Sequence, residues 1–337
     1  MRASRVLGVA AGLGCALANL ALAARGDGSA MIVGTAAAGA AATGNRCPRT
    51  ALTLAVQGST LCALLDAPAQ AIPRQLLRDW IERSARIVAN YYARFPVPQV
   101  VLRIQGSAGG GVHGGRTTND SGFIIQLGVG RDVTPAELAD DWVLVHEMVH
   151  LALPELGRRH HWLEEGLATY VEGIARAQSG NRDIADVWAE YRRSMPLGMP
   201  HAGEGGMDDT RDWGRTYWGG ALYCLQSDVA IREQTGNRVG LQAALRAILR
   251  ETGGYAAAGD IDEVLRIGDA ATGTRVLQDL YLRIKATPQA PDLEQLWSRL
   301  GIPANPKSQP FDAHAPLAAI RIAITARQAA LLAPNGS

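Results

Sequence analysis

The sequence has little of several features that mark particular protein classes. It contains four cysteines among 337 residues, and none of them has zinc-finger spacing. It has no block of like charge and a formal net charge of only +1, so binding to nucleic acid and electrostatic attachment to a membrane are both unsupported. Beyond residues 6–24, no stretch is long and apolar enough to cross a bilayer. The composition, 47% hydrophobic and 19% charged, is typical of a soluble globular protein with a substantial core.

The first 24 residues have the pattern of a secretory signal peptide. Arg2 and Arg5 give a basic start, and a weakly hydrophobic run follows and ends in small residues at positions 21–23. An uncleaved membrane anchor is the alternative, because the run approaches the length that spans a bilayer. Residues 25–46 are rich in alanine and glycine and are predicted to be a flexible leader. We therefore expect a periplasmic or secreted protein that does not contact the membrane after cleavage.

The cysteines after the leader suit an oxidising compartment. Cys47 and Cys62 flank a predicted strand and can form a disulfide, which would stabilise the fold by roughly 3 kcal/mol. Cys224 is left over on an apolar helix, and a buried free thiol is its simplest interpretation. The sequence alone does not decide whether the first two cysteines pair.

His146, Glu147 and His150 form the strongest chemical signal in the sequence, the pattern HExxH. Residues four apart on a helix lie on one face, so both imidazoles can bind a single metal ion. Glu147 follows the first histidine, where its carboxylate can reach a water bound to that ion. Neutral imidazole ligands with one position left open for water suit zinc. The pattern therefore predicts a zinc hydrolase, and among zinc hydrolases a peptidase.

The residues around the motif predict that it lies on one helix of about twenty residues. Thr134 is suited to the N-cap, Pro135 to the first helical position and Glu137 to the capping-box partner. Apolar residues surround the two histidines, and Pro154 ends the pattern. The alternative is a buried helix whose histidines are only hydrogen-bonded.

A third protein ligand is expected for such an ion. Leu153 and Leu156 stand where a metzincin needs a glycine and a histidine, so that class is excluded. His160 and His161 lie in a short basic connection, and their simpler interpretation is a solvated turn. A carboxylate from the following helix is the other choice, since two histidines and one glutamate form a well-attested zinc site.

The following helix is predicted over residues 162–178 from apolar residues at helical spacing. Glu165 and Glu172 lie seven positions apart on it, two turns along one side. The two carboxylates therefore face in similar directions, and the spacing alone does not decide which of them would bind the metal.

The HExxH pattern followed by the segment WLEEGLA at residues 162–168 resembles the gluzincin metallopeptidases. The likeness is nearest to the branch of aminopeptidase N and glycyl aminopeptidase. It implies Glu165 as the third zinc ligand, Glu164 as its solvent-side neighbour and Glu172 as a carboxylate that supports the ligands from behind. Fourteen residues separate His150 from Glu165, fewer than in aminopeptidase N. One wall of the cleft is therefore expected to differ from that family.

A second likeness to the same families lies at residues 215–222, in the pattern Y-x-x-G at the start of a helix. It implies that the hydroxyl of Tyr217 stabilises the oxyanion that forms during hydrolysis. A phenol donor aimed at a tetrahedral intermediate would supplement a metal ion. The alternative is an ordinary, partly buried tyrosine, because Tyr170, Tyr191 and Tyr223 are also available. The two likenesses together cover residues 122–236.

The segment before the motif is predicted to contain strands at residues 51–56, 100–104 and 122–128, with a helix at 72–92. Residues 106–115 are glycine-rich and lack the Lys-Ser/Thr of a phosphate loop, so they are expected to form a mobile loop. The resemblance implies that the strand at 122–128 lies along the cleft and pairs with an extended peptide. The aminopeptidase G-x-M-E-N segment is absent, so the sequence does not choose between cleavage at a chain end and cleavage within a chain.

The predicted fold class is α+β, a thermolysin-like zincin core with a small mixed sheet and active-site helices, followed by a mainly helical C-terminal lobe. The zincin-like lobe is predicted over residues 47–180, the helical lobe over 181–302, and a linker with the C-terminal tail over 303–337. Residues 317–325 are compatible with a strand or a helix. Within the second lobe, helices are predicted at residues 217–233, 239–251, 261–267, 274–284 and 292–300.

The predicted function is extracytoplasmic, zinc-dependent hydrolysis of peptide bonds by a metal-activated water, with Glu147 as the general base. The expected cofactor is Zn²⁺, the expected partner is a peptide or protein substrate, and no nucleic acid is expected. The alternative is a catalytically inactive gluzincin-like zinc protein that binds peptides or a partner. An intact Glu147 favours the enzyme, because a binding site has no need of a base.

Overall fold

A mixed sheet of five strands supports one side of the site. The computed structural model describes residues 47–119, 122–256 and 258–327, so the predicted signal peptide, the leader and the end of the tail lie outside the described residues. The strand order is β1-β2-β3-β5-β4. β2 pairs with β3 and β3 with β5 in parallel, whereas the two outer pairs are antiparallel. The strands are β1 (Leu52–Val56), β2 (Ser59–Leu65), β3 (Gln99–Ser107), β4 (Val112–Thr118) and β5 (Ile124–Gly130).

The first two strands form a hairpin that the sequence analysis only half predicted, because β2 was not foreseen. Gln57 and Gly58 both have positive φ, as the tight turns that match strand twist require. Cys47 and Cys62 form a disulfide that ties the start of the described chain to β2. The pairing that the sequence allowed is therefore present.

Helix α1 (Arg74–Tyr92) connects β2 to its parallel neighbour β3, as predicted for residues 72–92. Its apolar residues recur at helical spacing and are buried, among them Leu77, Trp80, Ile81 and Val88. The helix packs against β1 and against α3 (Val143–His150). This packing fixes the motif helix relative to the sheet.

The motif does not lie on one helix of about twenty residues, so that prediction is wrong. The chain forms α2 (Pro135–Asp140), breaks, and then forms α3. Thr134 and Glu137 make the predicted capping box at the start of α2. Asp141 then caps a new helix, because its carboxylate accepts hydrogen bonds from the backbone N–H groups of Val143 and Leu144. The indole of Trp80 also donates to Asp141, which fixes the break against α1.

The glycine-rich segment at 106–115 is not simply a loop, so that prediction is also wrong. Its second half forms β4, which pairs with β5 and lies at the edge of the sheet. The register shifts between His113 and Gly115, and Gly114 between them has φ +63°. Such a bulge adds one residue and redirects the side chains that follow it. β5 was expected to offer its edge to a peptide, but it lies between β3 and β4 and has both edges paired.

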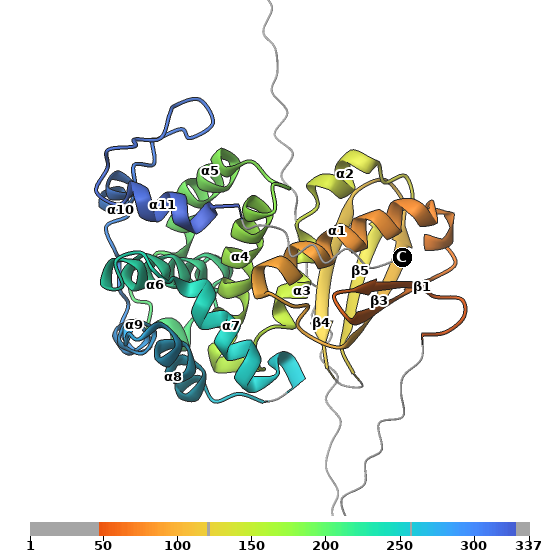
Figure 1. The fold of residues 1–337 in the computed structure, drawn as a ribbon, viewed down its shortest axis with the longest axis horizontal. Helices are drawn as coiled ribbons and strands as arrows, with labels where there is room; N and C mark the ends of the chain where they lie inside the picture. The colour runs from red at the N-terminus through yellow and green to blue at the C-terminus, as the bar shows by residue number, and fades with distance from the viewer. Residues whose placement is uncertain (1–46, 120–121, 257, 328–337) are drawn as a thin grey trace, which may run out of the picture. The chain divides into compact units, whose positions relative to one another are not determined.

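The rest of the described chain is helical, and the sheet and these helices lie on different sides of α3 in Figure 1. The helices predicted beyond residue 217 are present, residues 317–325 form a helix, and the α+β class is confirmed. Among the described residues no helix is long and apolar enough to span a membrane. The helices are α4 (His161–Gln178), α5 (Ile184–Ser194), α6 (Gly220–Gln234), α7 (Leu241–Thr252), α8 (Ile261–Thr272), α9 (Val276–Ile284), α10 (Leu293–Leu300) and α11 (Ala318–Thr325), with short helical turns η1 (Ala69–Ala71), η2 (Arg158–His160), η3 (Met195–Gly198), η4 (Met207–Asp209), η5 (Arg215–Gly219) and η6 (Gly254–Ala256).

Candidate metal centre and active site

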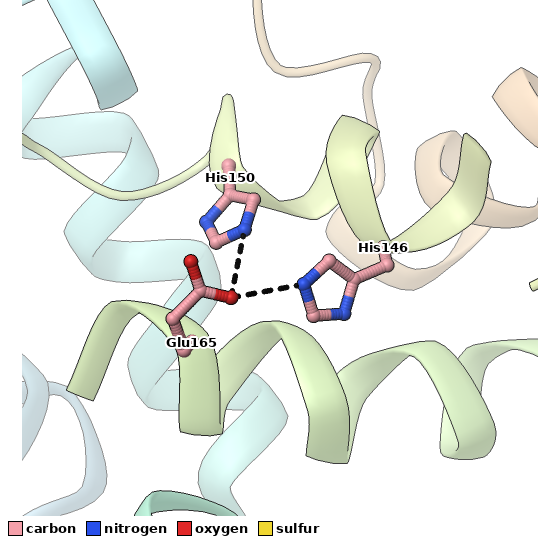
Figure 2. Close-up of side chains that lie close together, drawn as sticks. All are labelled: His146, His150 and Glu165. Atoms are coloured by element: carbon pink, nitrogen blue, oxygen red, sulfur yellow. Dashed lines mark hydrogen bonds and ion pairs between the residues drawn. The ribbon is translucent and has the colours of Figure 1, made fainter. Parts of the chain in front are cut away.

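Three predicted ligands converge where α3 packs against α4. His146 and His150 stand one turn apart on α3, and their ring centroids are 5.0 Å apart. Glu165 projects from α4 toward both rings (Figure 2). Its Oε2 lies 3.1 Å from Nε2 of His146 and 3.5 Å from Nε2 of His150. One ligand atom from each residue lies within 4.8 Å of the other two.

The distances from the Glu165 oxygen to the two ring nitrogens fit a tetrahedral metal ion. Ligands about 2.0–2.1 Å from a tetrahedral centre are roughly 3.3–3.4 Å from one another. The distances of 3.1 and 3.5 Å from the Glu165 oxygen to the two ring nitrogens bracket that value. Two imidazoles and one carboxylate are also a donor set that zinc accepts while keeping a fourth position open. The residues present therefore fit a zinc ion.

The electrostatics of the cluster favour a positive charge between its members. Burial opposes ionisation of Glu165, but hydrogen bonds from His146 and His150 outweigh it and hold the pKa of that carboxyl well below its usual range. Burial likewise opposes a charge on His150, yet the hydrogen bond and charge of Glu165 raise its pKa to about 9. Surroundings that stabilise a proton on His150 would also stabilise a metal cation bound there.

The short connection between the two helices contributes more than a solvated turn. His161 is half-exposed, and its Nε2 lies 3.4 Å from Oε1 of Glu165, while its Nδ1 lies 3.2 Å from Glu164. Glu164 was expected on the solvent side, but it folds back and accepts a 2.6 Å hydrogen bond from the backbone N–H of Leu156. His160 instead approaches Asp208 and the hydroxyl of Tyr281. His161 therefore contacts the predicted ligand Glu165, an interaction that was not expected from the sequence.

Glu147 contacts the edge strand β4. The hydroxyl of Thr117 lies 2.7 Å from Oε2 of Glu147 and 2.9 Å from its backbone carbonyl oxygen. A Cβ on Gly115 would lie 2.5 Å from Cγ and 2.7 Å from Oε1 of the same glutamate. The edge strand therefore touches the side chain that the motif assigns as the base.

Tyr217 lies beside the cluster on η5, a π-helical turn that precedes α6. The helix predicted from residue 217 therefore begins with a π-turn, a form that is frequent at functional sites. The Tyr217 ring stacks on His146 at 6.1 Å with an interplanar angle of 18°. The other candidates are buried with their hydroxyls bonded elsewhere. Tyr170 binds Asp228, Tyr191 binds a backbone oxygen on α4, and Tyr223 binds one on α9.

Two glycines let α6 approach α4 closely enough to bring Tyr217 to the ligands. A Cβ on Gly166 would collide with the backbone of Gly220, and a Cβ on Gly220 would collide with the carbonyl oxygen of Trp162. These are the glycines of the two segments that resembled a known family. Their physical role here is to bring two backbones into contact.

Glu172 is buried two turns beyond Glu165 and is paired with Arg176, whose Nη1 lies 2.8 Å from its carboxylate. Burial raises the pKa of Glu172 to about 7, against the opposing effect of Arg176. Arg176 also donates to the backbone oxygen of Asp140 at the end of α2. The pair therefore ties α4 to the helix break, and a supporting role of Glu172 toward the ligands stays a prediction.

Comparison with known proteins bears on the fold. No protein-family model and no curated protein matches the sequence. The structure is similar to an aminopeptidase N family protein from Idiomarina loihiensis, with a TM-score of 0.58 and 14% identity over 75% of this chain and 49% of that one. An M1 zinc metallopeptidase from Deinococcus radiodurans has a TM-score of 0.45 and 16% identity, over 72% and 52% of the two chains. The chain spans about half the length of these proteins. The first likeness shows that it shares the α+β fold of the Idiomarina loihiensis protein.

Proposed function

We propose that this protein is a zinc-dependent peptidase. The observation that supports the proposal best is the convergence of His146, His150 and Glu165, with one ligand atom of each within 4.8 Å of the other two and Glu147 next to the first histidine in sequence. His146, His150 and Glu165 would hold the ion. When bound, such an ion lowers the pKa of a water and polarises a carbonyl group.

The chain's own residues supply the proton transfers and part of the charge stabilisation. Glu147 takes a proton from the attacking water and then delivers it to the leaving nitrogen of the peptide. Tyr217 donates a hydrogen bond from its hydroxyl to the oxyanion that forms from the carbonyl oxygen. The stacking of Tyr217 on His146 supports this role, since it keeps the phenol next to the ligands.

The proposal includes an extracytoplasmic location, with residues 1–24 as the signal peptide. The disulfide between Cys47 and Cys62 supports it, because such bonds persist in oxidising compartments. Release of residues 1–24 from the secreted protein, seen by N-terminal sequencing, would test this part of the proposal separately from catalysis.

The catalytic proposal is tested by measuring zinc and cleavage in the same samples. Wild-type protein should bind one zinc ion per chain and cleave peptides from a mixed library, with products identified by mass spectrometry. Glu147→Gln should keep the zinc and lose about 10³-fold or more in kcat. Unchanged turnover in Glu147→Gln would remove Glu147 from the mechanism. Peptide capture without cleavage by zinc-loaded wild type would instead favour a binding module.

A further inference from the structure

The edge strand β4 contacts Glu147 with two residues that share one face. Gly115 and Thr117 are two positions apart, so their side-chain positions point to the same side of the strand. α3 packs on this strand and brings Glu147 onto that side. The bulge at Gly114 sets which residues of β4 face α3, because it shifts the register by one position.

Thr117 offers one hydroxyl proton to two acceptors on Glu147. The carboxylate oxygen Oε2 is nearer, at 2.7 Å, than the backbone oxygen at 2.9 Å. The carboxylate is also the charged acceptor, and hydrogen bonds to charged groups are shorter and stronger than neutral ones. The proton is therefore directed mainly to Oε2.

Gly115 lies at the other carboxylate oxygen. A Cβ at this position would be 2.7 Å from Oε1 and 2.5 Å from Cγ of Glu147, closer than side-chain atoms pack. Only a residue without a side chain therefore lets β4 approach the carboxylate this closely. Thr117 contacts one oxygen of the carboxylate, and Gly115 leaves room for the other.

We propose that β4 orients the general base: Thr117 holds one oxygen of Glu147, and Gly115 leaves the space that the other oxygen occupies. Thr117 is a positioning residue, because it acts through Glu147. The kinetic consequence rests on the proposed function, whereas the contact itself does not. Small displacements of a catalytic group cost on the order of tenfold to a hundredfold in rate.

The test compares substitutions that remove the hydroxyl or keep it. Thr117→Val keeps the shape and should lower kcat about 10–100-fold, with KM changed less than about threefold and zinc content unchanged. Thr117→Ser restores the hydroxyl and should recover activity to within about threefold of wild type. Thr60→Val is the matched control, since Thr60 is half-buried in β2, at the other side of the sheet from β4. Equal losses in Thr117→Val and Thr117→Ser would overturn the proposal.

A second measurement does not require turnover. At fixed zinc concentration, Thr117→Val should lower the midpoint of thermal unfolding by about 3 °C, because Oε2 loses its donor. In a Glu147→Ala background the same change should shift the midpoint by less than half as much, because only the bond to the backbone oxygen of residue 147 is left to lose. Equal shifts in both backgrounds would overturn the proposal even if the protein cleaves no peptide. Absence of cleavage alone would count against the proposed function and not against the contact.

A different observation concerns tryptophans at the site. Among the described residues, the large apolar side chains that are exposed include two tryptophans, Trp142 at 51% and Trp213 at 60%. Trp142 contacts His146 edge-on at 5.6 Å, and Trp213 stacks on Tyr217 at 5.4 Å. With the stack of Tyr217 on His146, the four rings form a continuous series of contacts from α3 to η5.

We infer that Trp142 and Trp213 contact a large apolar or aromatic side chain of the peptide substrate, an inference that rests on the proposed function. Exposed tryptophan surface is unfavourable in water, and clustered exposed apolar surface marks binding sites. The two rings touch a proposed metal ligand and the proposed oxyanion donor. A group bound against them therefore belongs to the molecule whose bond is cleaved.

The inference is tested by measuring, with calorimetry, how tightly tripeptides bind to the zinc-loaded Glu147→Gln protein. A tripeptide of alanines is compared with three tripeptides that carry one phenylalanine at successive positions. At least one phenylalanine peptide should bind about tenfold tighter than trialanine, and Trp213→Ala or Trp142→Ala should reduce this preference to about twofold. Leu282→Ala, an exposed apolar residue on α9, is the control and should keep the preference. A preference that survives both tryptophan changes, or no preference in the parent, would overturn the inference. Peptide cleavage without side-chain preference would leave the proposed function standing.

Discussion

The helices that hold the proposed metal ligands and the strand that contacts the proposed base reach the site in different ways. His146 and His150 are four residues apart on α3, so the helix itself places them on one face. Glu165 follows on α4, shortly after the connection between the two helices. On β4 the contact depends on pairing with β5 and on a bulge at a glycine. Local periodicity is visible in a sequence, whereas strand pairing between separate segments is not. The difference explains why the sequence revealed one region and concealed the other.

The two regions should also respond differently to substitution. On the proposed function, we expect the helices to determine whether zinc binds and β4 to determine the turnover of the zinc-loaded site. Changes on the helices should therefore alter metal affinity, and changes on β4 should alter turnover at full zinc occupancy. The predictions below test that separation.

The largest effect is expected from loss of the third ligand. Glu165→Gln should weaken zinc binding by roughly 10³-fold or more, because it removes the charged oxygen that both histidine nitrogens face. Glu164→Gln is the matched control on the same helix and should change the zinc dissociation constant less than about tenfold. Competition with a chelator of known affinity measures both. Equal losses would mean that the negative charge of the segment, and not the ligand geometry, holds the metal.

A smaller effect is expected from β4. Gly115→Ala should lower kcat about 10–100-fold while zinc binding stays within about threefold of wild type, since the new methyl group collides with Glu147 and not with a ligand. Gly205→Ala is the control, because a Cβ there makes only ordinary contact with Asp209. Steady-state kinetics with zinc quantified in the same sample checks the result. Loss of zinc in Gly115→Ala would break the separation between the two regions.

Protons should compete with zinc for His150, so zinc affinity should change gradually with pH. This effect should depend on the residues of α3 and α4 and not on β4. Below about pH 9 the metal-free His150 carries a proton, because Glu165 raises its pKa to about 9. Zinc must displace that proton, so its affinity should fall about tenfold for each unit that the pH drops from 8 to 6. Thr117→Val should leave this slope unchanged, since the hydroxyl of Thr117 bonds to Glu147. A dissociation constant that does not vary over this range would contradict the charge distribution described here.

The smallest effect on the site is expected from the far end of the sheet. Replacing Cys47 and Cys62 by serine should lower the free energy of unfolding by roughly 3 kcal/mol, because the disulfide closes a loop. Turnover of the folded variant should stay within about twofold of wild type, since β2 is separated from β4 by β3 and β5. Chemical denaturation and kinetics on the same preparation measure the two. A large loss of turnover in a fully folded sample of the variant would show that the sheet transmits strain from β2 to β4.

The order of most helices could be predicted from the sequence, because their apolar residues recur at helical spacing and their capping residues can be recognised. The capping box of Thr134 and Glu137 and the span of α4 appear as predicted. The break at Asp141 was not predicted, since apolar residues resume directly after it and a tertiary hydrogen bond from Trp80 fixes Asp141. β4 was missed because glycines at 114 and 115 and polar residues after them give no alternation of apolar side chains.

Within the candidate site, the resemblance identified the glutamate that faces both histidines, but it did not reveal the contacts of His161 and Thr117. Both residues have bland surroundings in sequence, a basic turn and a polar run. The partner of Thr117 is Glu147 on another element, α3, and the partner of His161 is Glu165, one turn further along α4. The sequence signals that would have indicated them are weak. His161 stands four residues before the proposed ligand Glu165, and Gly115 stands two residues before Thr117.

The sequence by itself determined that two imidazoles share one helix face, since the periodicity of an α-helix fixes which side chains are neighbours. The resemblance to a known family implied that the following helix supplies a carboxylate. Only the tertiary structure decided which oxygen and nitrogen atoms approach, which strand lies under Glu147, and which tyrosine reaches the ligands. Those choices depend on strand pairing, on a glycine bulge and on the close crossing of α4 and α6 at Gly166 and Gly220. Contacts between segments distant in sequence leave no local pattern from which they could be predicted.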